Sequence, residues 1–216
     1  MKRTVVFLGP PASGKGSQAV RFSRTHGFLH FDMGGALREE VETCSPLADK
    51  IRAYTDAGQL VPLELVSELV NRTLNRNSER DVLLDGFPRS MEQAEMLEGV
   101  LERLGRQLTM VVLIDVPEPV VVERTVNRRV CPTCGRIYNL LTFPPRNDQV
   151  CDDDAAELSH RRDDTEELIR ARLKVYRQQT QPIIAHYESA GVLARVDGCG
   201  DMDAVGKQIE SIVLGE

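Results

Sequence analysis

The sequence predicts an α/β fold, in which a parallel sheet lies between two layers of helices. Short apolar runs such as 5–8 and 111–114 alternate along the chain with longer segments of helical pattern. Parallel strands are covered by helices on both faces, so they read as continuous apolar runs of this kind. A glycine-rich stretch, GPPASGKGS at 9–17, directly follows the first run and is typical of a loop that joins a strand to a helix.

The length of 216 residues is enough for one α/β domain that carries small insertions, and 41% hydrophobic residues suffice for a buried core. No segment approaches the ~20 consecutive apolar residues of a membrane span. The first apolar run is too short for a signal peptide, so we expect a cytoplasmic protein. We also expect a monomer. A net charge of −6 argues against nucleic acid or an anionic membrane as a partner.

The remaining elements of the core follow from the same alternation. After the first strand at 5–8, we expect strands over 81–85, 110–114 and 193–196. Helices are expected, from their apolar spacing, over 14–25, 90–104, 119–128, 165–187 and 202–214. These segments predict a three-layer core with helices on both faces of the sheet.

Two stretches break the alternation of strands and helices. Residues 32–61 have a helical pattern without a strand after it, and residues 131–160 contain turns and short β-prone pieces without a helix signal. Neither stretch has enough apolar residues for a large core of its own. We therefore expect insertions at 32–61 and 127–164 on a core domain made of 1–31, 62–126 and 165–216.

The loop at 9–17 has the spacing of a phosphate-binding loop, Gly9-x-x-x-x-Gly14-Lys15. Its successive backbone N–H groups can line a concavity, and the N-terminus of the following helix adds partial positive charge. Lys15 then supplies a full positive charge to the phosphates. The expected phosphate ligands are Gly9, Ala12, Ser13, Gly14, Lys15, Gly16 and Ser17.

Two motifs together point to a family. The hydroxyl residue after the lysine is displaced by one position, in Lys15-Gly16-Ser17, and a second motif, Asp85-Gly-Phe-Pro-Arg89, directly follows a strand. With both motifs the chain resembles the adenylate kinases, nucleoside monophosphate kinases whose loop reads GxPGxGKGT, and the resemblance covers essentially the whole chain. Ala12 stands where that family usually has glycine. A Cβ fits there only if Ala12 has a negative φ or is not crowded by phosphate.

The resemblance implies the reaction MgATP + AMP ⇌ 2 ADP and places the second motif at the phosphates. In the family the aspartate, here Asp85, lies near Mg²⁺ and its waters, and the arginine, here Arg89, grips the phosphate of the acceptor. Gln93 matches the glutamine that reads the adenine edge. The implied catalytic residues are Lys15, Asp85, Arg89, Arg124, Arg128, Arg161 and Arg172, with Arg124 and Arg128 four apart on one helix face.

The resemblance also assigns the two nucleotide sites. For ATP it implies, beyond the loop residues, Arg124, Arg128, Ile137, Tyr138 and Gly200. For AMP it implies Met33, Arg38, Gln59, Leu60, Val61, Gly86, Phe87, Pro88, Arg89, Gln93, Arg161 and Arg172. No side chain needs to act as a base, because the phosphate of AMP, with a second pKa of ~6, is mostly dianionic at neutral pH. Cations and Mg²⁺ stabilise the loose transition state instead.

Three cysteines within 21 residues suggest a metal site in the second insertion. Cys131-x-x-Cys134 is followed after sixteen residues by Cys151, and Asp154 stands three residues further on. A carboxylate is an acceptable ligand, so we expect a structural Zn²⁺ bound by these four residues, with His160 as a weaker competitor for the fourth position. The resemblance makes this insertion a lid over ATP. A nucleic-acid-binding zinc ribbon is the alternative, which the surrounding acidic residues disfavour.

One motif departs from the family. Adenylate kinases normally carry a Ser/Thr-Thr-Gly-Asp run before the arginine that corresponds to Arg38, whereas this chain has Met33 at the hydroxyl position and Gly35 in place of the aspartate. Methionine cannot donate that hydrogen bond, which to a charged group is worth ~1.5–3 kcal/mol, so we expect AMP to bind more weakly than in typical relatives. The alternatives are a kinase for another nucleoside monophosphate, or a nucleotide-sensing or scaffold protein with weak turnover.

Overall fold

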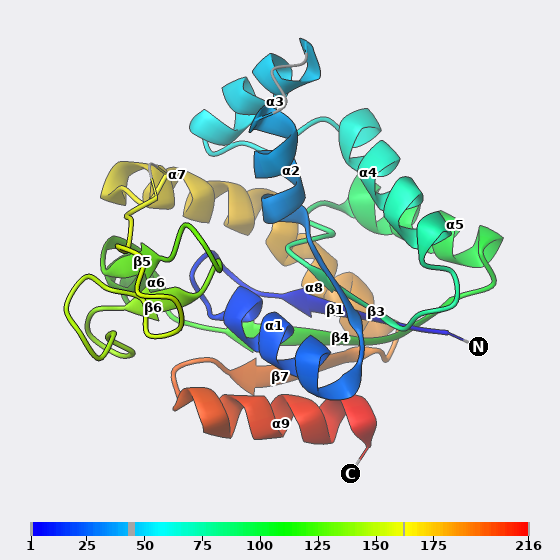
Figure 1. The fold of residues 1–216 in the computed structure, drawn as a ribbon. Coiled ribbons are helices and arrows are strands. Elements are labelled where there is room, and N and C mark those ends of the chain that lie inside the picture. Colours follow the sequence, from blue (N-terminus) through cyan, green and yellow to red (C-terminus); the bar gives the residue numbers. More distant parts are fainter. Residues whose placement is uncertain (1, 43–45, 162, 216) are drawn as a thin grey trace.

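The computed structural model describes residues 2–42, 46–161 and 163–215, and a five-stranded parallel sheet lies at its centre (Figure 1). The strands lie in the order β2-β3-β1-β4-β7. Their bounds are Leu29–Asp32 for β2, Val82–Asp85 for β3, Arg3–Leu8 for β1, Gln107–Asp115 for β4 and Leu193–Asp197 for β7. Each strand is parallel to its neighbours, which confirms the predicted fold class.

Helices cover both faces of this sheet. Along β1, Val5 and Phe7 face one layer of helices while Val6 and Leu8 face the other, and all four side chains are buried. The first layer contains α1 (Lys15–His26) and α9 (Met202–Leu214). The second layer contains α4 (Leu63–Arg76), α5 (Met91–Arg103) and α8 (Gln181–Ser189). Of the helices in the described ranges, none is long and apolar enough to cross a membrane.

Two parts of the chain lie outside the three layers (Figure 1). The first is the helix pair α2 (Met33–Glu42) and α3 (Pro46–Asp56), at the top of the view. The second contains the antiparallel strands β5 (Arg128–Val130) and β6 (Ile137–Asn139), at its left. The helices α6 (Glu118–Val126) and α7 (Glu166–Val175) lead into and out of this second part. Between 131 and 165 the described residues form no helix, as the sequence predicts.

The sheet has one strand more than the sequence analysis predicts. β2 consists of Leu-His-Phe-Asp, in which Phe31 is buried and the other three residues are only partly covered. Because β2 is an edge strand, it lacks the continuous apolar run that marks the inner strands, and the search for such runs misses it. The helix α4 is likewise absent from the prediction.

The helix expected over 119–128 ends earlier, at Val126. The side-chain amide of Asn127 donates to the carbonyl of Glu123 at 2.9 Å, and the carbonyl of Asn127 accepts from the N–H of Leu140 at 3.0 Å. The chain then enters β5, so Arg128 lies on a strand while Arg124 lies on the helix. The prediction that these two arginines share one helix face is therefore wrong.

The long helix expected over 165–187 is interrupted by a widened π turn, η1 (Tyr176–Thr180). In this turn the N–H of Gln181 donates to the carbonyl of Tyr176, five residues earlier. Pro182 explains the widening, because it has no N–H to donate and its ring would crowd the carbonyl four residues before it. The prediction of one regular helix is wrong at this turn, although the chain is helical on both sides of it.

Arg106 joins the segments that lead into three strands. It is 6% exposed, and its guanidinium donates to the carbonyl of Arg80 at 2.6 Å and of Ser78 at 3.0 Å, just before β3. It also reaches the hydroxyl of Thr4 on β1 at 3.4 Å, and Arg106 itself directly precedes β4. One buried cation therefore satisfies several backbone carbonyls at the amino ends of the strands.

We predict that Arg106→Met lowers the free energy of unfolding by about 2–4 kcal/mol, because buried carbonyls lose a charged donor. Arg103→Met, on the exposed end of α5, is the matched control and should change it by less than about 0.5 kcal/mol. Urea unfolding followed by circular dichroism measures both variants. Equal effects of the two substitutions would contradict the role given to Arg106.

Candidate active site

A cavity of about 1500 Å³ opens at the carboxyl ends of the strands, beside α2, α3 and the segment 127–164, which we call the lid. Every residue that the sequence analysis assigns to the nucleotide sites or to catalysis lines this cavity, except Phe87. Phe87 is fully buried in the core and precedes a cis peptide bond to Pro88. One cavity therefore gathers side chains that the sequence spreads from residue 9 to residue 200.

The loop between β1 and α1 wraps around the side chain of Lys15. Its Nζ donates to the carbonyl of Gly9 at 3.0 Å and to the carbonyl of Pro10 at 2.7 Å. Gly9 has to be glycine, because a Cβ there would lie 2.3 Å from the carbonyl oxygen of Ile114 on β4. The loop therefore holds the ammonium group at the positive N-terminal end of α1, where an anion is favoured.

Ala12 has a φ of 53°, in the left-handed region. The first condition under which a Cβ was expected to fit, a negative φ, is therefore not met. The methyl group packs against a small apolar cluster that contains Val116, Val121, Ile169 and Leu173. In this cluster Val121 belongs to α6, and Ile169 and Leu173 belong to α7, the helices that lead into and out of the lid.

Asp85 ends β3 directly beside the loop. Its side chain is 7% exposed, and its Oδ2 lies 3.4 Å from Nε2 of His30 on β2. A Cβ at Gly16 would lie 3.3 Å from the same oxygen, so glycine allows the carboxylate to approach the first turn of α1. The arrangement places a buried anion next to the loop lysine.

Arg89 is fixed through three of its atoms. Its Nε donates to the carbonyl of Gly86 at 2.6 Å, and its backbone N–H donates to Oε1 of Gln93 at 2.8 Å. Gln93 lies in the first turn of α5, where the hydroxyl of Ser90 accepts from its N–H at 3.3 Å. The carbonyl of Arg89 accepts from the hydroxyl of Thr180 at 2.8 Å. Both the backbone and the side chain of this arginine are therefore held in place.

The first turn of α2 contains the departures from the adenylate kinase motif. Oδ2 of Asp32 accepts from Nη2 of Arg38 at 3.3 Å, and a Cβ on Gly35 would lie 2.7 Å from that oxygen. The glycine thus leaves room for the Asp32 carboxylate. Met33 is 3% exposed and belongs to an apolar cluster with Leu37, so it gives the cavity an apolar wall where the family motif has a hydroxyl.

Two aspartates that the sequence analysis did not assign hold arginines of the lid side. Nε of Arg128 donates to Oδ2 of Asp164 at 2.7 Å, and Asp164 is fully buried. Nη2 of Arg172 donates to Oδ2 of Asp163 at 2.7 Å. Both aspartates lie within three residues of Arg161 in the sequence. This proximity to a predicted site arginine could have indicated that they belong to the site.

Positive charges crowd one another in this cavity. Burial is the largest cause that lowers the pKa of Arg161, to about 10, and the nearby charge of Arg128 adds to it. Burial likewise lowers the pKa of Arg89, with a further contribution from Arg172. Guanidinium groups whose charge is disfavoured in this way gain most from a bound anion. The cavity is thus suited to a polyanionic ligand.

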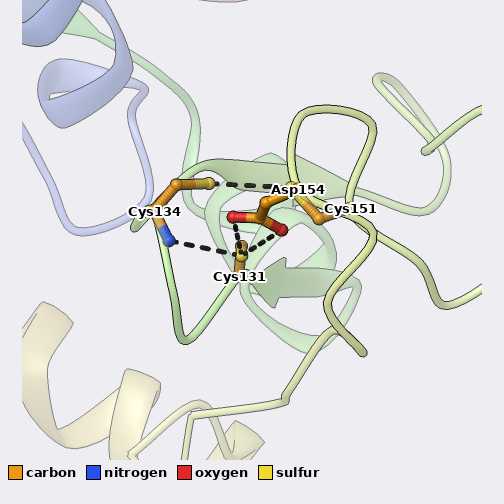
Figure 2. Close-up of side chains that lie close together, drawn as sticks. All are labelled: Cys131, Cys134, Cys151 and Asp154. Carbon is orange, nitrogen blue, oxygen red and sulfur yellow. Dashed lines mark hydrogen bonds between the residues drawn. The ribbon is translucent and has the colours of Figure 1, made fainter.

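Figure 2 shows the four predicted metal ligands of the lid close together. Their ligand atoms all lie within 4.8 Å of one another. Sγ of Cys131 is 3.2 Å from Oδ2 of Asp154, and Sγ of Cys134 is 3.6 Å from Sγ of Cys151. A tetrahedral Zn²⁺ with Zn–S bonds of about 2.3 Å separates two sulfurs by about 3.8 Å, so the arrangement fits such an ion.

The fourth position of this group is a carboxylate. The N–H of Ala156 donates to Oδ1 of Asp154 at 3.0 Å, and this bond is the largest cause that lowers the pKa of Asp154 to about 2. The carboxylate is therefore anionic at neutral pH, as a ligand must be. Among the described residues, the group that could hold a metal includes Asp154 and does not include His160.

Comparison with known proteins gives a consistent result. A family model described as adenylate kinase matches residues 7–192. An adenylate kinase of Thermotoga maritima is 45% identical over 215 residues, which cover 99% of this chain and 98% of the relative. Adenylate kinases of Archaeoglobus fulgidus and Clostridium novyi are 42% and 40% identical, and each match covers at least 97% of both chains.

The ionisation of Lys15 provides a test of the phosphate loop. Burial is the main cause that lowers its pKa, to about 8; Asp85 opposes this shift, and the charges of Arg89 and Arg128 strengthen it. A bound phosphate favours the charged ammonium and raises the pKa again. Phosphate binding near or above pH 8 must therefore take up a proton at Lys15.

We predict an uptake of roughly 0.5–0.8 proton on tripolyphosphate binding at pH 8.5, where a lysine of pKa about 8 is mostly neutral. At pH 6.5 the lysine is already charged, so its contribution should vanish. Isothermal titration calorimetry in two buffers of different ionisation enthalpy counts the protons. Lys15→Arg, which stays charged throughout, is the control and should abolish the uptake at pH 8.5. The same uptake in both proteins would exclude Lys15 as its source.

Proposed function

The chain belongs to the adenylate kinase family, and from this premise we propose how its residues divide the reaction MgATP + AMP ⇌ 2 ADP. It is a nucleoside monophosphate kinase, which transfers the γ-phosphoryl group of MgATP to AMP and also catalyses the reverse reaction. The observation that supports the division of roles is that Lys15, Asp85 and all six arginines assigned from the sequence line one cavity. Phosphoryl transfer spreads negative charge over oxygen atoms in a loose transition state, which positioned cations stabilise.

The donor nucleotide occupies the side of the cavity formed by the phosphate loop. Lys15 and the N–H groups of the loop hold the β and γ phosphates, and Asp85 orients the Mg²⁺ of the substrate through water. Arg124 and Arg128 reach the same phosphates from α6 and β5. The adenine lies between the lid residues Ile137 and Tyr138 and the loop at Gly200, which all line the cavity.

The acceptor occupies the side formed by α2, α3 and the start of α5. Arg38 and Arg89 bind the phosphate of AMP, and Gln93 reads the adenine edge. The remaining wall for the base and ribose comes from Met33, Gln59, Leu60, Val61, Gly86 and Pro88. Arg161 and Arg172 bind the phosphoryl group that is transferred. Phe87 supports this wall from the core rather than touching the nucleotide, since it lies outside the cavity lining.

The chain divides into three functional parts in this proposal. Residues 1–31, 62–126 and 165–216 form the core domain, 32–61 hold the acceptor, and 127–164 form a lid that excludes water from the γ-phosphoryl group. A structural Zn²⁺ orders the lid through Cys131, Cys134, Cys151 and Asp154. The lid needs it, because in its described residues the apolar cluster consists of Tyr138, Leu158 and Ala156 beside two of the cysteines, which is a small core.

The protein acts as a cytoplasmic monomer that keeps adenine nucleotides in balance. A single chain supplies all the residues assigned to the donor site and the acceptor site, so no second copy is needed to complete either. Cysteine ligands must stay reduced to bind Zn²⁺, and the cytoplasm keeps thiols reduced.

The choice of acceptor is tested by a coupled assay that measures ADP formation with AMP, CMP, UMP or GMP beside MgATP. We predict that AMP is preferred and that Met33→Thr lowers the KM for AMP by about 3–10-fold, because the hydroxyl restores a polar contact. The KM for ATP should stay within twofold, and removal of a buried apolar side chain should cost about 1–3 kcal/mol of stability.

Preference for another nucleotide would overturn AMP as the acceptor. An AMP KM that Met33→Thr leaves unchanged would overturn only the weakening attributed to Met33. Leu74→Thr, which loses a fully buried side chain of α4 that does not line the cavity, is the control for lost stability and should leave the KM for AMP unchanged.

The zinc site is tested through its fourth ligand. We predict that the wild type binds one Zn²⁺ per chain and that Asp154→Cys binds it more tightly. The Asp154→Ala variant should release its Zn²⁺ to a chelator at least 10-fold more readily, because one of the four ligands is gone. Release to a metallochromic dye measures the loss, and thermal unfolding of each variant with and without chelator measures the stabilisation. Asp153→Ala is the matched control and should behave like the wild type. Equal zinc release from the Asp154→Ala and Asp153→Ala variants would remove Asp154 from the ligand set.

A further inference from the structure

The π turn between α7 and α8 turns the hydroxyl of Thr180 toward the acceptor side of the cavity. Thr180 is 5% exposed, and its Oγ1 donates to the carbonyl of Arg89 at 2.8 Å. The two residues are 91 positions apart, on different elements of the fold. A threonine in a regular helix bonds to a carbonyl of its own preceding turn, as Thr125 does with Val121 at 2.8 Å. Thr180 instead satisfies a carbonyl outside its helix.

This bond completes the fixation of Arg89. Its N–H is held by Gln93 at 2.8 Å, its carbonyl by Thr180, and its Nε by the carbonyl of Gly86 at 2.6 Å. The guanidinium lies close against the backbone, since a Cβ on Gly86 would lie only 2.7 Å from Nη2. Its direction therefore depends on how the backbone at Arg89 is held. If the carbonyl loses its donor, the backbone at Arg89 loses one of its anchors, and the position from which the side chain extends into the cavity is held less firmly.

The same helix carries a second cation of the site. Arg172 lies on α7, eight residues before Thr180, and pairs with Asp163 at 2.7 Å. The hydroxyl bond therefore ties the backbone of Arg89 to the helical segment that presents Arg172. π turns often occur at functional sites, where the extra residue re-aims a side chain.

We propose that Thr180 is a positioning residue for the acceptor phosphate: its hydroxyl, turned inward by the π turn, fixes the carbonyl of Arg89 and thereby aims the guanidinium that binds that phosphate. The inference rests on the role proposed for Arg89 above. Thr180 acts through Arg89 rather than on the nucleotide, so its removal should weaken AMP and leave ATP unaffected.

The test compares Thr180→Val, which keeps the shape and loses the hydroxyl, with Thr180→Ser, which keeps the hydroxyl. The KM for AMP should rise about 5–10-fold in the valine variant and stay within twofold in the serine variant, with the KM for ATP within twofold in both. Thr125→Val removes an equally buried hydroxyl that does not touch Arg89, and should leave the KM for AMP unchanged. Thr180→Ala replaces the valine variant in this comparison if that variant does not fold.

A double-mutant cycle with Arg89→Ala separates a positioning role from general loss of structure. The dissociation constant of AMP, followed by nuclear magnetic resonance titration, should rise with Thr180→Val in the wild type but change less than twofold in the Arg89→Ala background. A full effect in that background, an equal rise in the KM for ATP, or an unchanged KM for AMP would overturn the inference. If Arg89→Ala itself leaves AMP binding intact, the proposed role of Arg89 fails instead.

Discussion

The burial of several cations close to one another is the constraint on which this structure depends. Lys15, Arg89 and Arg161 each have a lowered pKa, and burial is the largest cause in every case. Two unit charges about 4 Å apart repel by about 4 kcal/mol at an effective dielectric constant of 20, so such groups do not gather unless the fold holds them. The phosphate loop fixes Lys15, and the segment from Gly86 to the first turn of α5 fixes Arg89, before any nucleotide arrives.

The fold holds its cations by two different means. On the core side the partners are backbone carbonyls, as for Lys15 with Pro10 and for Arg89 with Gly86, and a carbonyl dipole neutralises little of the charge. On the lid side the partners are carboxylates, as for Arg128 with the buried Asp164. On the core side a bound phosphate therefore adds to the partial compensation that Asp85 gives Lys15, whereas on the lid side it must share the arginines with their aspartates.

The sequence predicts those parts of the molecule that obey a local rule. Continuous apolar runs predict the inner strands. The spacing of the glycines predicts the phosphate loop, because these glycines allow close backbone approach, as at Gly9 beside Ile114. Prediction failed where a distant contact decides the local structure. The edge strand β2 shows no apolar run, Asn127 ends a helix by bonding to Glu123, and the π turn before Pro182 re-aims Thr180 toward a carbonyl 91 residues away. Except for Phe87, the predicted site residues line the cavity, because the motifs mark which strand ends carry chemistry. The aspartates that pair with the arginines belong to no such motif.

Ala12 has a strained backbone conformation, and its methyl group packs against an apolar cluster of the helices that carry two of the site's arginines. A left-handed conformation costs an alanine about 1–2 kcal/mol relative to its usual backbone, and burial of one methyl group returns about 0.8 kcal/mol. The methyl group lies against the apolar cluster formed by Val121 of α6 and Ile169 of α7. These helices carry Arg124 and Arg172 and lead into and out of the lid. A glycine would relieve the strain but would remove this contact with the cluster. The alanine therefore links the phosphate loop to an apolar cluster that is shared by the two helices carrying Arg124 and Arg172.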